Sequence, residues 1–272
     1  MGNDMRDSAR FFIGDIHGEA RLLEQQLAFI EDEARRLNIL PQVTFLGDIV
    51  DRGPDSKLAL QLVRSTLQLW PGSKLLLGNH DDLFLQVLKR RRLDNFTEQW
   101  LKKCGGDRTV ANFTTESFMP LVCQEIERQI PDELEMLQDA DLIVGYGPFV
   151  ACHAGINGMV PLDQQVEDDI LWIREGFLDR VDPFMPPVIH GHTIMEDYLP
   201  TVTENRISLD TGAFLSGRLT SLLVDHEQRS LRFFQTLPDG VGEVQPRVIN
   251  RGKGTIYDRL RGLYKAHAAS RS

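Results

Sequence analysis

Near its start the chain has three short apolar runs, and each run ends at a glycine that is followed by Asp or Asn. The runs with their endings are Phe11-Phe12-Ile13 before Gly14-Asp15, Val43-Thr44-Phe45-Leu46 before Gly47-Asp48, and Leu75-Leu76-Leu77 before Gly78-Asn79. Short runs that are apolar on both faces are typical of buried strands. Since the loops that follow such strands carry functional side chains, we expect Asp15, Asp48 and Asn79 to lie along one edge of a sheet.

The segments between these runs repeat apolar residues with the period of an α-helix. One face of the first segment carries Leu23, Leu27, Ile30, Ala34 and Leu37, spaced 4, 3, 4 and 3. In the second segment we expect Ser56 to cap a helix, and a third helix is expected over residues 81–92. The order β-α-β-α-β predicts layers of sheet and helix.

Residues from about Arg91 to Asp141 break this alternation, and we interpret them as a helical insertion. Strands are expected to resume at 149–152, 188–189, 207–209, 219–224 and 231–234, with a hairpin turn at 225–228 between the last two. We therefore expect one domain over residues 1–250, with the insertion at about 91–141. Residues 251–272 are basic and form a C-terminal tail or docking helix in this interpretation.

Charge and cysteine content restrict the class of protein. The formal net charge is −10, so we expect no binding to duplex nucleic acid. Cys104, Cys123 and Cys152 are widely spaced and odd in number, which favours reduced structural thiols. Residues 1–10 lack the apolar core of a signal peptide, and no apolar run approaches the roughly 20 residues of a membrane helix. We expect a cytoplasmic protein with no membrane partner.

Histidines occupy the same kind of loop as the acidic residues. Of the seven histidines, His17, His80, His153 and His192 stand in glycine-containing loops after apolar runs. A lone histidine in such a loop is more often a structural hydrogen-bonding group than a metal ligand. Several such loops at one sheet edge instead favour metal binding. Carboxylate, imidazole and amide oxygen together suit manganese, iron or zinc. A carboxylate that bridges two such ions clamps an attacking hydroxide in place.

Five sequence blocks resemble the signature blocks of the phosphoprotein phosphatase (PPP) family, in that family's order. They are Gly14-Asp15-Ile16-His17-Gly18, Gly47-Asp48-Ile49-Val50-Asp51-Arg52-Gly53, Gly78-Asn79-His80-Asp81, His153-Ala154-Gly155 and Gly191-His192-Thr193. The resemblance spans residues 14–193. It implies an α/β (α+β) fold of the calcineurin-like metallophosphoesterase type, which is a β-sandwich flanked by helices. It also implies a metal-dependent hydrolase of phosphate esters.

The resemblance implies a site for two divalent metal ions, for which we favour manganese, with iron or zinc as alternatives. The six implied ligands are Asp15, His17, Asp48, Asn79, His153 and His192, with Asp48 bridging the two ions. His190 lies two residues before His192, and we interpret it as a packed histidine or as one that supports a ligand.

The resemblance further implies four residues that act on the substrate. Arg52 and Arg174 would hold the phosphoryl oxygens, because a guanidinium fork suits that group. A salt bridge on the protein surface is the alternative role for Arg174. His80 would protonate the leaving oxygen, and Asp51 would orient His80 and stabilise its charged form.

The substrate class rests on finer similarities. Four features resemble bacterial serine/threonine protein phosphatases: Asp51, Gly191-His192-Thr193, Trp172-x-Arg174 and the segment Trp100…Gly105-Gly106…Thr109. Asp81 instead resembles the symmetrical diadenosine tetraphosphate hydrolases, because eukaryotic protein phosphatases usually have Glu there. We favour hydrolysis of phosphoserine and phosphothreonine in a phosphoprotein substrate, with dinucleoside polyphosphate or RNA-cap hydrolysis as the alternative. An inactive metal-binding scaffold would need a broken site, and every implied residue is present.

Overall fold

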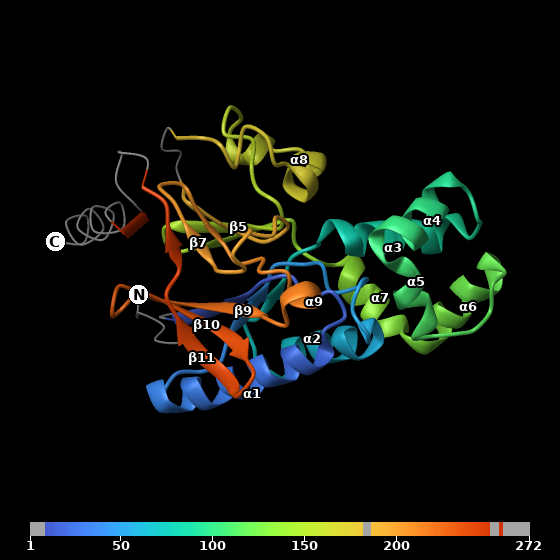
Figure 1. Ribbon diagram of the computed structural model, residues 1–272, viewed down its shortest axis with the longest axis horizontal. Helices are drawn as coiled ribbons and strands as arrows, with labels where there is room; N and C mark the ends of the chain where they lie inside the picture. The colour runs from blue at the N-terminus through green and yellow to red at the C-terminus, as the bar shows by residue number, and fades with distance from the viewer. Residues whose placement is uncertain (1–8, 182–185, 251–255, 258–272) are drawn as a thin grey trace.

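The computed structural model describes residues 9–181, 186–250 and 256–257, and two six-stranded sheets packed face to face form its centre (Figure 1). The first sheet has the order β11-β10-β9-β1-β2-β3 and consists of β1 (Ala9–Ile13), β2 (Val43–Phe45), β3 (Lys74–Leu75), β9 (Thr220–Asp225), β10 (Ser230–Leu237) and β11 (Gly240–Val244). The second has the order β12-β7-β8-β6-β5-β4 and consists of β4 (Ile143–Tyr146), β5 (Phe149–Cys152), β6 (Val188–His190), β7 (Thr201–Val202), β8 (Arg206–Ser208) and β12 (Arg247–Val248). This is the sandwich of sheets with flanking helices that the sequence predicts.

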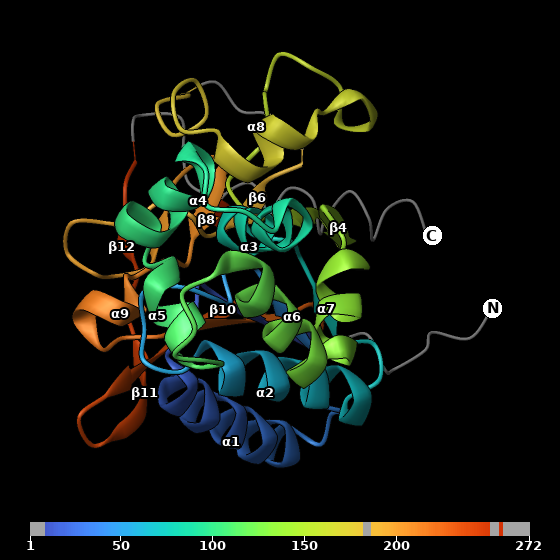
Figure 2. The ribbon, with the colours of Figure 1, turned by 90° about the vertical axis from the view of Figure 1, so that its right-hand side faces the viewer.

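Helices cover the outer faces of both sheets. α1 (Ala20–Leu37) and α2 (Ser56–Leu69) pack on the first sheet, and α8 (Glu167–Trp172) packs on the second. Figure 2 shows α1 and α2 along one side of the molecule and α8 at the opposite side. Two short helices, η3 (Leu162–Gln164) and α9 (Ala213–Ser216), lie in loops that connect larger elements. None of the described helices is long and apolar enough to cross a membrane.

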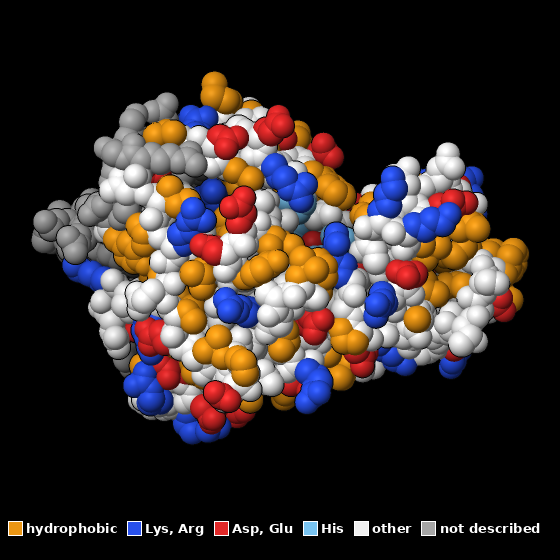
Figure 3. Space-filling model, viewed as in Figure 1, with side chains coloured by type: hydrophobic (Ala, Val, Ile, Leu, Met, Phe, Trp, Pro, Cys, Tyr) orange, Lys and Arg blue, Asp and Glu red, His pale blue; other side chains and the backbone are white. Residues whose placement is uncertain are grey.

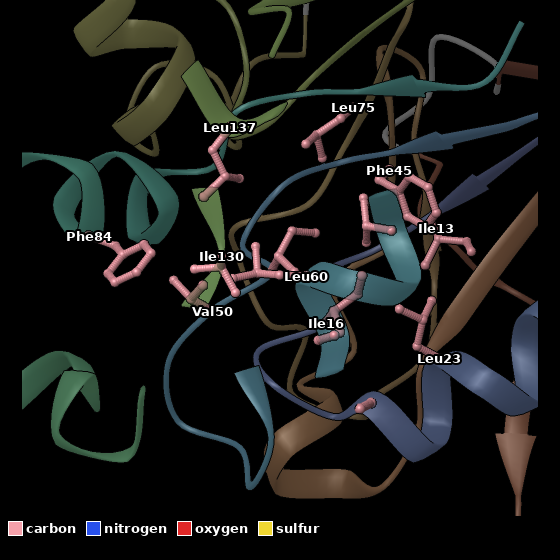
Figure 4. Close-up of a cluster of buried hydrophobic side chains, with 14 of the residues drawn as sticks. Ile13, Ile16, Leu23, Phe45, Val50, Leu60, Leu75, Phe84, Ile130 and Leu137 are labelled. Atoms are coloured by element: carbon pink, nitrogen blue, oxygen red, sulfur yellow. The ribbon is translucent and has the colours of Figure 1, made fainter. Parts of the chain in front are cut away.

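Successive side chains of the central strands enter different parts of the core. Phe11 and Ile13 of β1 pack towards the helices, whereas Phe12 between them packs against the second sheet. Figure 4 shows Phe45 of β2 and Leu60 of α2 in the same helix-facing cluster as Ile13. Because both faces of these strands are buried, their sequences are apolar throughout instead of alternating.

Most of the expected elements are present, with two corrections at helix starts. The hairpin of β9 and β10 is confirmed by their antiparallel pairing. Ser56 is not the cap of α2: the cap is Asp55, whose carboxylate accepts the Leu58 N–H, and Ser56 Oγ instead accepts the Asp51 N–H. The third helix begins at Asn79 instead of Asp81, because the Asp81 side chain accepts the Gly78 N–H and closes the first turn.

A region of short helices extends to one side of the sandwich (Figure 1). It consists of α3 (Asn79–Arg90), α4 (Asn95–Gln99), the π-helical turn η2 (Trp100–Cys104), α5 (Gly106–Ala111), α6 (Met119–Gln129) and α7 (Pro131–Gln138). At the other end of the chain, the proposed tail of residues 251–272 lies outside the described residues except for Ile256 and Tyr257.

Candidate metal centre

The polar loops of both sheets meet at one edge of the sandwich. The pairs β1–β2, β2–β3, β5–β6 and β6–β8 are parallel, so these strands end on the same side. The loops that follow β1, β2, β3, β5 and β6 carry five buried residues, which are Asp15, Asp48, Asn79, His153 and His192. Figure 3 shows a hollow between α8 and the helical region, with histidine at its floor and Lys and Arg side chains on both of its sides.

Asp48 lies at the centre of the site. Its Oδ1 atom accepts the His80 backbone N–H at 2.8 Å and lies 3.4 Å from Nε2 of His153. Its Oδ2 atom lies 3.5 Å from Nε2 of His17. Two groups of side chains have ligand atoms within 4.8 Å of one another, and Asp48 belongs to both: one contains His17 and His80, the other His153 and His192. A carboxylate shared by two such groups is placed to bridge two ions.

Backbone carbonyls select the tautomer of two of these imidazoles. Nδ1 of His17 donates to the Val50 carbonyl at 2.9 Å, and Nδ1 of His153 donates to the Leu46 carbonyl at 2.8 Å. In a neutral ring this leaves a lone pair on Nε2, and both Nε2 atoms face Asp48 oxygens. Electron-rich atoms that face each other in a buried site need a positive charge between them. Imidazoles anchored in this way are typical metal ligands.

Protonation of His153 supplies such a charge when no metal is bound. Burial opposes it, but the charge of Asp48, the hydrogen bond to Asp48 and the charge of Asp15 together outweigh burial and raise the pKa of His153 to about 10. His17 behaves oppositely, because burial lowers its pKa to about 3 despite the charge of Asp48. For Asp48 itself, burial is outweighed by His153, His80 and His17, which hold its pKa well below the ordinary range. Asp48 is therefore ionised, as a metal ligand must be.

Asn79 joins the second group. Its Oδ1 atom lies 2.8 Å from Nε2 of His153 and 2.8 Å from Nδ1 of His192. Ligand atoms about 2.1 Å from one ion and at right angles are roughly 3 Å apart, so this spacing fits a shared cation. The other ring nitrogen of His192 is buried and has no hydrogen-bond partner among the described residues. These observations fit the second of the two implied metal positions.

Asp15 lies against the loop that carries His192. Its carboxylate oxygens are 3.0 and 3.2 Å from the His192 backbone N–H, which donates to them. Gly191 permits this approach, since a Cβ there would lie 1.9 Å from Oδ1 of Asp15. Burial, followed by the charge of Asp210, raises the pKa of Asp15 well above its ordinary value. Asp15 belongs to neither compact ligand group, and its role as a ligand of the first ion remains a proposal.

Several residues of the site have strained backbone conformations. Non-glycine residues with positive φ include His17 (47°), Asp48 (52°), Asp51 (74°), Arg52 (68°) and His192 (64°). Such conformations are sparsely populated, cost of order 1–3 kcal/mol each, and persist where surrounding contacts impose them. Their concentration in the loops at one sheet edge indicates that side-chain placement there takes precedence over local backbone stability.

His80 and Asp51 form a buried pair beside Asp48. Nδ1 of His80 lies 2.7 Å from Oδ2 of Asp51. Burial would lower the pKa of His80, but the charges of Asp48 and Asp51 raise it instead. The pKa of Asp51 is also raised, chiefly by burial. Of the two groups, the histidine carries the proton, because its own environment favours the charged ring and the Asp51 carboxylate receives further hydrogen bonds.

Those further hydrogen bonds come from the helical region. Nε1 of Trp100 donates to Oδ2 of Asp51 at 2.9 Å, and Oγ1 of Thr109 donates to Oδ1 at 2.7 Å. A Cβ on Gly106 would lie 2.3 Å from the Trp100 ring, so glycine is required where this indole packs. Trp100 thus contributes to the site through a contact that its position in the sequence did not predict. It is a buried residue that holds Asp51.

Arg52 is placed from the same region. Its backbone N–H donates to the Gly105 carbonyl at 3.3 Å, and a Cβ on Gly105 would lie 2.7 Å from that nitrogen. Its Nη2 atom lies 3.4 Å from Nε2 of His80. Its guanidinium carbon lies 4.8 Å from the ring centre of Phe214, in α9. Arg52 is therefore directed at the His80 side of the site.

Arg174 acts on the site at His192. It is exposed, and its charge contributes to the lowered pKa of His192 after burial and His153. Among the described residues no ion pair joins Arg174 to Glu167 or Glu175, which disfavours the surface salt bridge as its role. Its neighbour Trp172 is partly exposed, and the Trp172 ring lies 6.1 Å from that of His192.

His190 is directed away from the ligands. Its Nε2 atom lies 2.8 Å from Oγ of Ser208, and its ring packs edge-on against Phe177. Burial and the charge of Arg206 lower its pKa well below the ordinary value. It is packed within the second sheet, and its Nδ1 atom donates to the carbonyl of Gly191 at 2.9 Å, so the structure is consistent with both roles that the sequence left open.

Two buried carboxylates were not assigned roles from the sequence. Asp81 Oδ1 accepts the Ile49 and Val50 N–H groups at 2.9 and 3.3 Å and so ties the Asp48 loop to α3. Asp210 follows β8 and caps the Gly212 N–H at 2.9 Å; burial raises its pKa to about 6. Asp210 directly follows the expected strand at 207–209, and this position at the end of a strand could have identified it, although no glycine precedes it.

Comparison with known proteins places these features in a family. Residues 11–206 match the calcineurin-like phosphoesterase family. The symmetrical bis(5'-nucleosyl)-tetraphosphatase of Vibrio campbellii is 31% identical over 159 residues, which cover 57% of this chain and 47% of that protein. The chain thus spans about half the length of that relative.

Two further relatives are matched over most of their length. The asymmetrical bis(5'-nucleosyl)-tetraphosphatase PrpE of Anoxybacillus flavithermus is 27% identical over 77% of this chain and 88% of its own length. Serine/threonine-protein phosphatase 2 of Salmonella typhimurium is 27% identical over 76% of this chain and 89% of its own length. A metallophosphoesterase structure from Sphaerobacter thermophilus superposes with a TM-score of 0.51 at 14% identity, over 88% of this chain and 89% of that one. That likeness concerns the fold alone.

Proposed function

The chain belongs to the calcineurin-like phosphoesterases, a family of metal-dependent hydrolases, and from this we propose that it is a serine/threonine protein phosphatase. The observation that carries the proposal is the His80–Asp51 pair, at 2.7 Å, which Trp100 and Thr109 hold in place. The alkoxide of serine or threonine is a poor leaving group, so its departure needs strong proton donation. A histidine kept charged by an anchored carboxylate supplies that proton.

The remaining residues of the site bind and orient the phosphoester. Arg52 lies beside His80, the charge of Arg174 acts on His192, and both guanidinium groups suit the equatorial oxygens of a phosphoryl group. Arg52 lies beside His80, so the phosphoryl group that it holds would have its leaving oxygen near the proton donor. Proton transfer from a positioned donor is worth roughly 10²–10⁴ in rate.

Asp15, His17, Asp48, Asn79, His153 and His192 would hold two divalent cations, and we propose manganese, with iron or zinc as alternatives. When bound, the cations supply a hydroxide nucleophile at neutral pH and offset phosphate charge. They would also replace the proton on His153 and balance the buried charge of Asp48. The expected setting is the cytoplasm, with phosphoproteins as partners.

Hydrolysis of dinucleoside polyphosphates or capped RNA ends is the second candidate. Two relatives named bis(5'-nucleosyl)-tetraphosphatases favour it. Asp81 no longer favours this candidate, because its carboxylate accepts three backbone N–H groups and stabilises the loops instead of binding the substrate. A phosphoanhydride leaves as a stabilised phosphate and has less need of the His80–Asp51 pair.

One side-by-side assay tests the proposal. With manganese added, kcat/KM is measured for phosphoserine and phosphothreonine peptides and for diadenosine tetraphosphate. We expect the phosphopeptides to be preferred. A preference for the dinucleotide would overturn the protein phosphatase assignment, and the absence of turnover of both and of p-nitrophenyl phosphate would favour an inactive scaffold.

A further inference from the structure

Phe214 contacts two residues of the site from an element that no sequence block includes. It lies in α9, between Gly212 and Gly217, which both have positive φ. Its ring is 5.2 Å from that of His17, at an interplanar angle of 81°. The guanidinium carbon of Arg52 lies 4.8 Å from the same ring centre. Phe214 therefore touches both a proposed metal ligand and a proposed phosphate-binding residue.

The guanidinium of Arg52 has little else to hold it. Its Nε atom is buried and has no hydrogen-bond partner in the part of the chain that the structure describes. Within the same described residues, no carboxylate lies within ion-pair distance of Arg52, and the one polar side-chain atom near its guanidinium is Nε2 of His80, 3.4 Å from Nη2. The aromatic face of Phe214 is thus the main contact that orients this cation.

An aromatic support suits a residue that must bind phosphate. A carboxylate partner would occupy the N–H donors of Arg52 and neutralise its charge, whereas a ring face attracts the cation and leaves those donors free. Carboxylates are nearby, since the charge of Arg52 acts on the buried Asp210. Without the ring, the approach to His80 would be the one remaining side-chain contact of the guanidinium among the described residues.

We infer that Phe214 is a positioning residue that holds the Arg52 guanidinium ready for the substrate phosphoryl group. The inference rests on the proposed phosphate-binding role of Arg52, but not on which phosphoester is the natural substrate. Cation–π contacts are worth about 0.5–2 kcal/mol, which is about a 2- to 30-fold change. The effect should therefore be moderate and should be transmitted through Arg52.

A double-mutant cycle on p-nitrophenyl phosphate tests this inference. Phe214→Leu removes the ring face, and we expect kcat/KM to fall about 2- to 30-fold, mainly through a higher KM. Phe214→Tyr, which keeps the ring, should retain activity near that of the wild type. In the Arg52→Ala background, Phe214→Leu should have almost no further effect, because its target is gone. Leu215→Ala is the matched control, since Leu215 is the exposed neighbour in α9.

Three outcomes would overturn the inference. The first is an unchanged kcat/KM in Phe214→Leu. The second is an equal loss on adding Phe214→Leu to the wild type and to Arg52→Ala. The third is a loss of bound manganese in Phe214→Leu, which would mean that the ring acts through His17. If Phe214→Leu does not fold, Phe214→Met takes its place in the cycle. An Arg52→Ala variant as active as the wild type would instead refute the proposed role of Arg52.

Discussion

Asp51 reaches His80 across 29 positions of the sequence, with 2.7 Å between the carboxylate Oδ2 and the imidazole Nδ1. The same oxygen accepts the Trp100 indole N–H, and the other oxygen accepts the Thr109 hydroxyl. Because Nδ1 is engaged, Nε2 is the ring nitrogen left to face the substrate. This favours proton donation as the role of His80, although its imidazole also falls within a candidate ligand group.

His80→Asn separates these two roles. If His80 is the general acid, the substitution should leave manganese content nearly unchanged and lower kcat by roughly 10²–10⁴ on alkyl phosphates. An aryl phosphate, whose leaving group needs less protonation, should be affected less. Metal content is measured by elemental analysis of the purified variant, and loss of the ions would make His80 a ligand.

Trp100→Phe tests the support behind the pair. The ring volume is largely kept, but the hydrogen bond to Asp51 is lost, and a hydrogen bond to a charged group is worth about 1.5–3 kcal/mol. This hydrogen bond lowers the pKa of Asp51, so its loss should raise that pKa further and leave less of the negative charge that stabilises the charged His80; the raised pKa of His80 should then fall. The alkaline limb of the kcat profile should therefore move to lower pH, because the acid form is lost earlier.

Trp70→Phe is the control for that experiment, since Trp70 ends α2 and has no contact with Asp51. An unshifted alkaline limb in Trp100→Phe, or an equal shift in Trp70→Phe, would show that the indole does not act through His80.

Local sequence patterns predicted most of the fold but only part of the site. Apolar runs ending in glycine predicted β1, β2 and β3, because buried parallel strands are apolar on both faces. Four strands were missed, namely β4, β7, β11 and β12. Glycine interrupts β4 and β11, β7 and β12 have two residues each, and β12 pairs with β7, which is distant in the chain. The contacts of Trp100 and Phe214 were missed for the same reason: nothing near them in the sequence identifies Asp51 or Arg52 as their partners.

Asp48→Asn tests the bridging carboxylate. Asp48 is shared by both ligand groups, and three histidines hold its pKa low, so that it stays ionised. Removing that charge should lower manganese content and abolish most activity, because the bridge sets the separation of the ions. Treatment of the wild type with a chelator should have the same effect, reversed by manganese. Undiminished activity in either case would refute the two-metal site.

Glu33→Gln tests the contact between α1 and the β10–β11 hairpin. Glu33 accepts hydrogen bonds from Arg36 and Arg232, which lower its pKa. A lowered carboxylate pKa stabilises the fold above the unfolded value of about 4.3 and ceases to do so as pH falls through the folded value. Glu33→Gln should thus lower the free energy of unfolding by about 1 kcal/mol at pH 7 and by less at pH 4. In urea unfolding, Glu31→Gln should cost less, since the Glu31–Arg35 pair is exposed.

Asp51→Ala should separate the two substrate classes. A serine or threonine ester needs the proton that a charged His80 donates, whereas a phosphoanhydride leaves as a stabilised anion and needs less help. Removing Asp51 takes away the partner that helps to raise the pKa of His80, so less of the acid form is present at neutral pH. We therefore expect kcat/KM for a phosphopeptide to fall far more than that for diadenosine tetraphosphate.

Metal content should stay constant, because Asp51 belongs to neither ligand group. Asp51→Asn, which can still accept the Trp100 hydrogen bond, should give an intermediate loss. Equal losses on both substrates would mean that the His80–Asp51 pair does not distinguish them, and the protein phosphatase assignment would lose its main support while the metal centre stood.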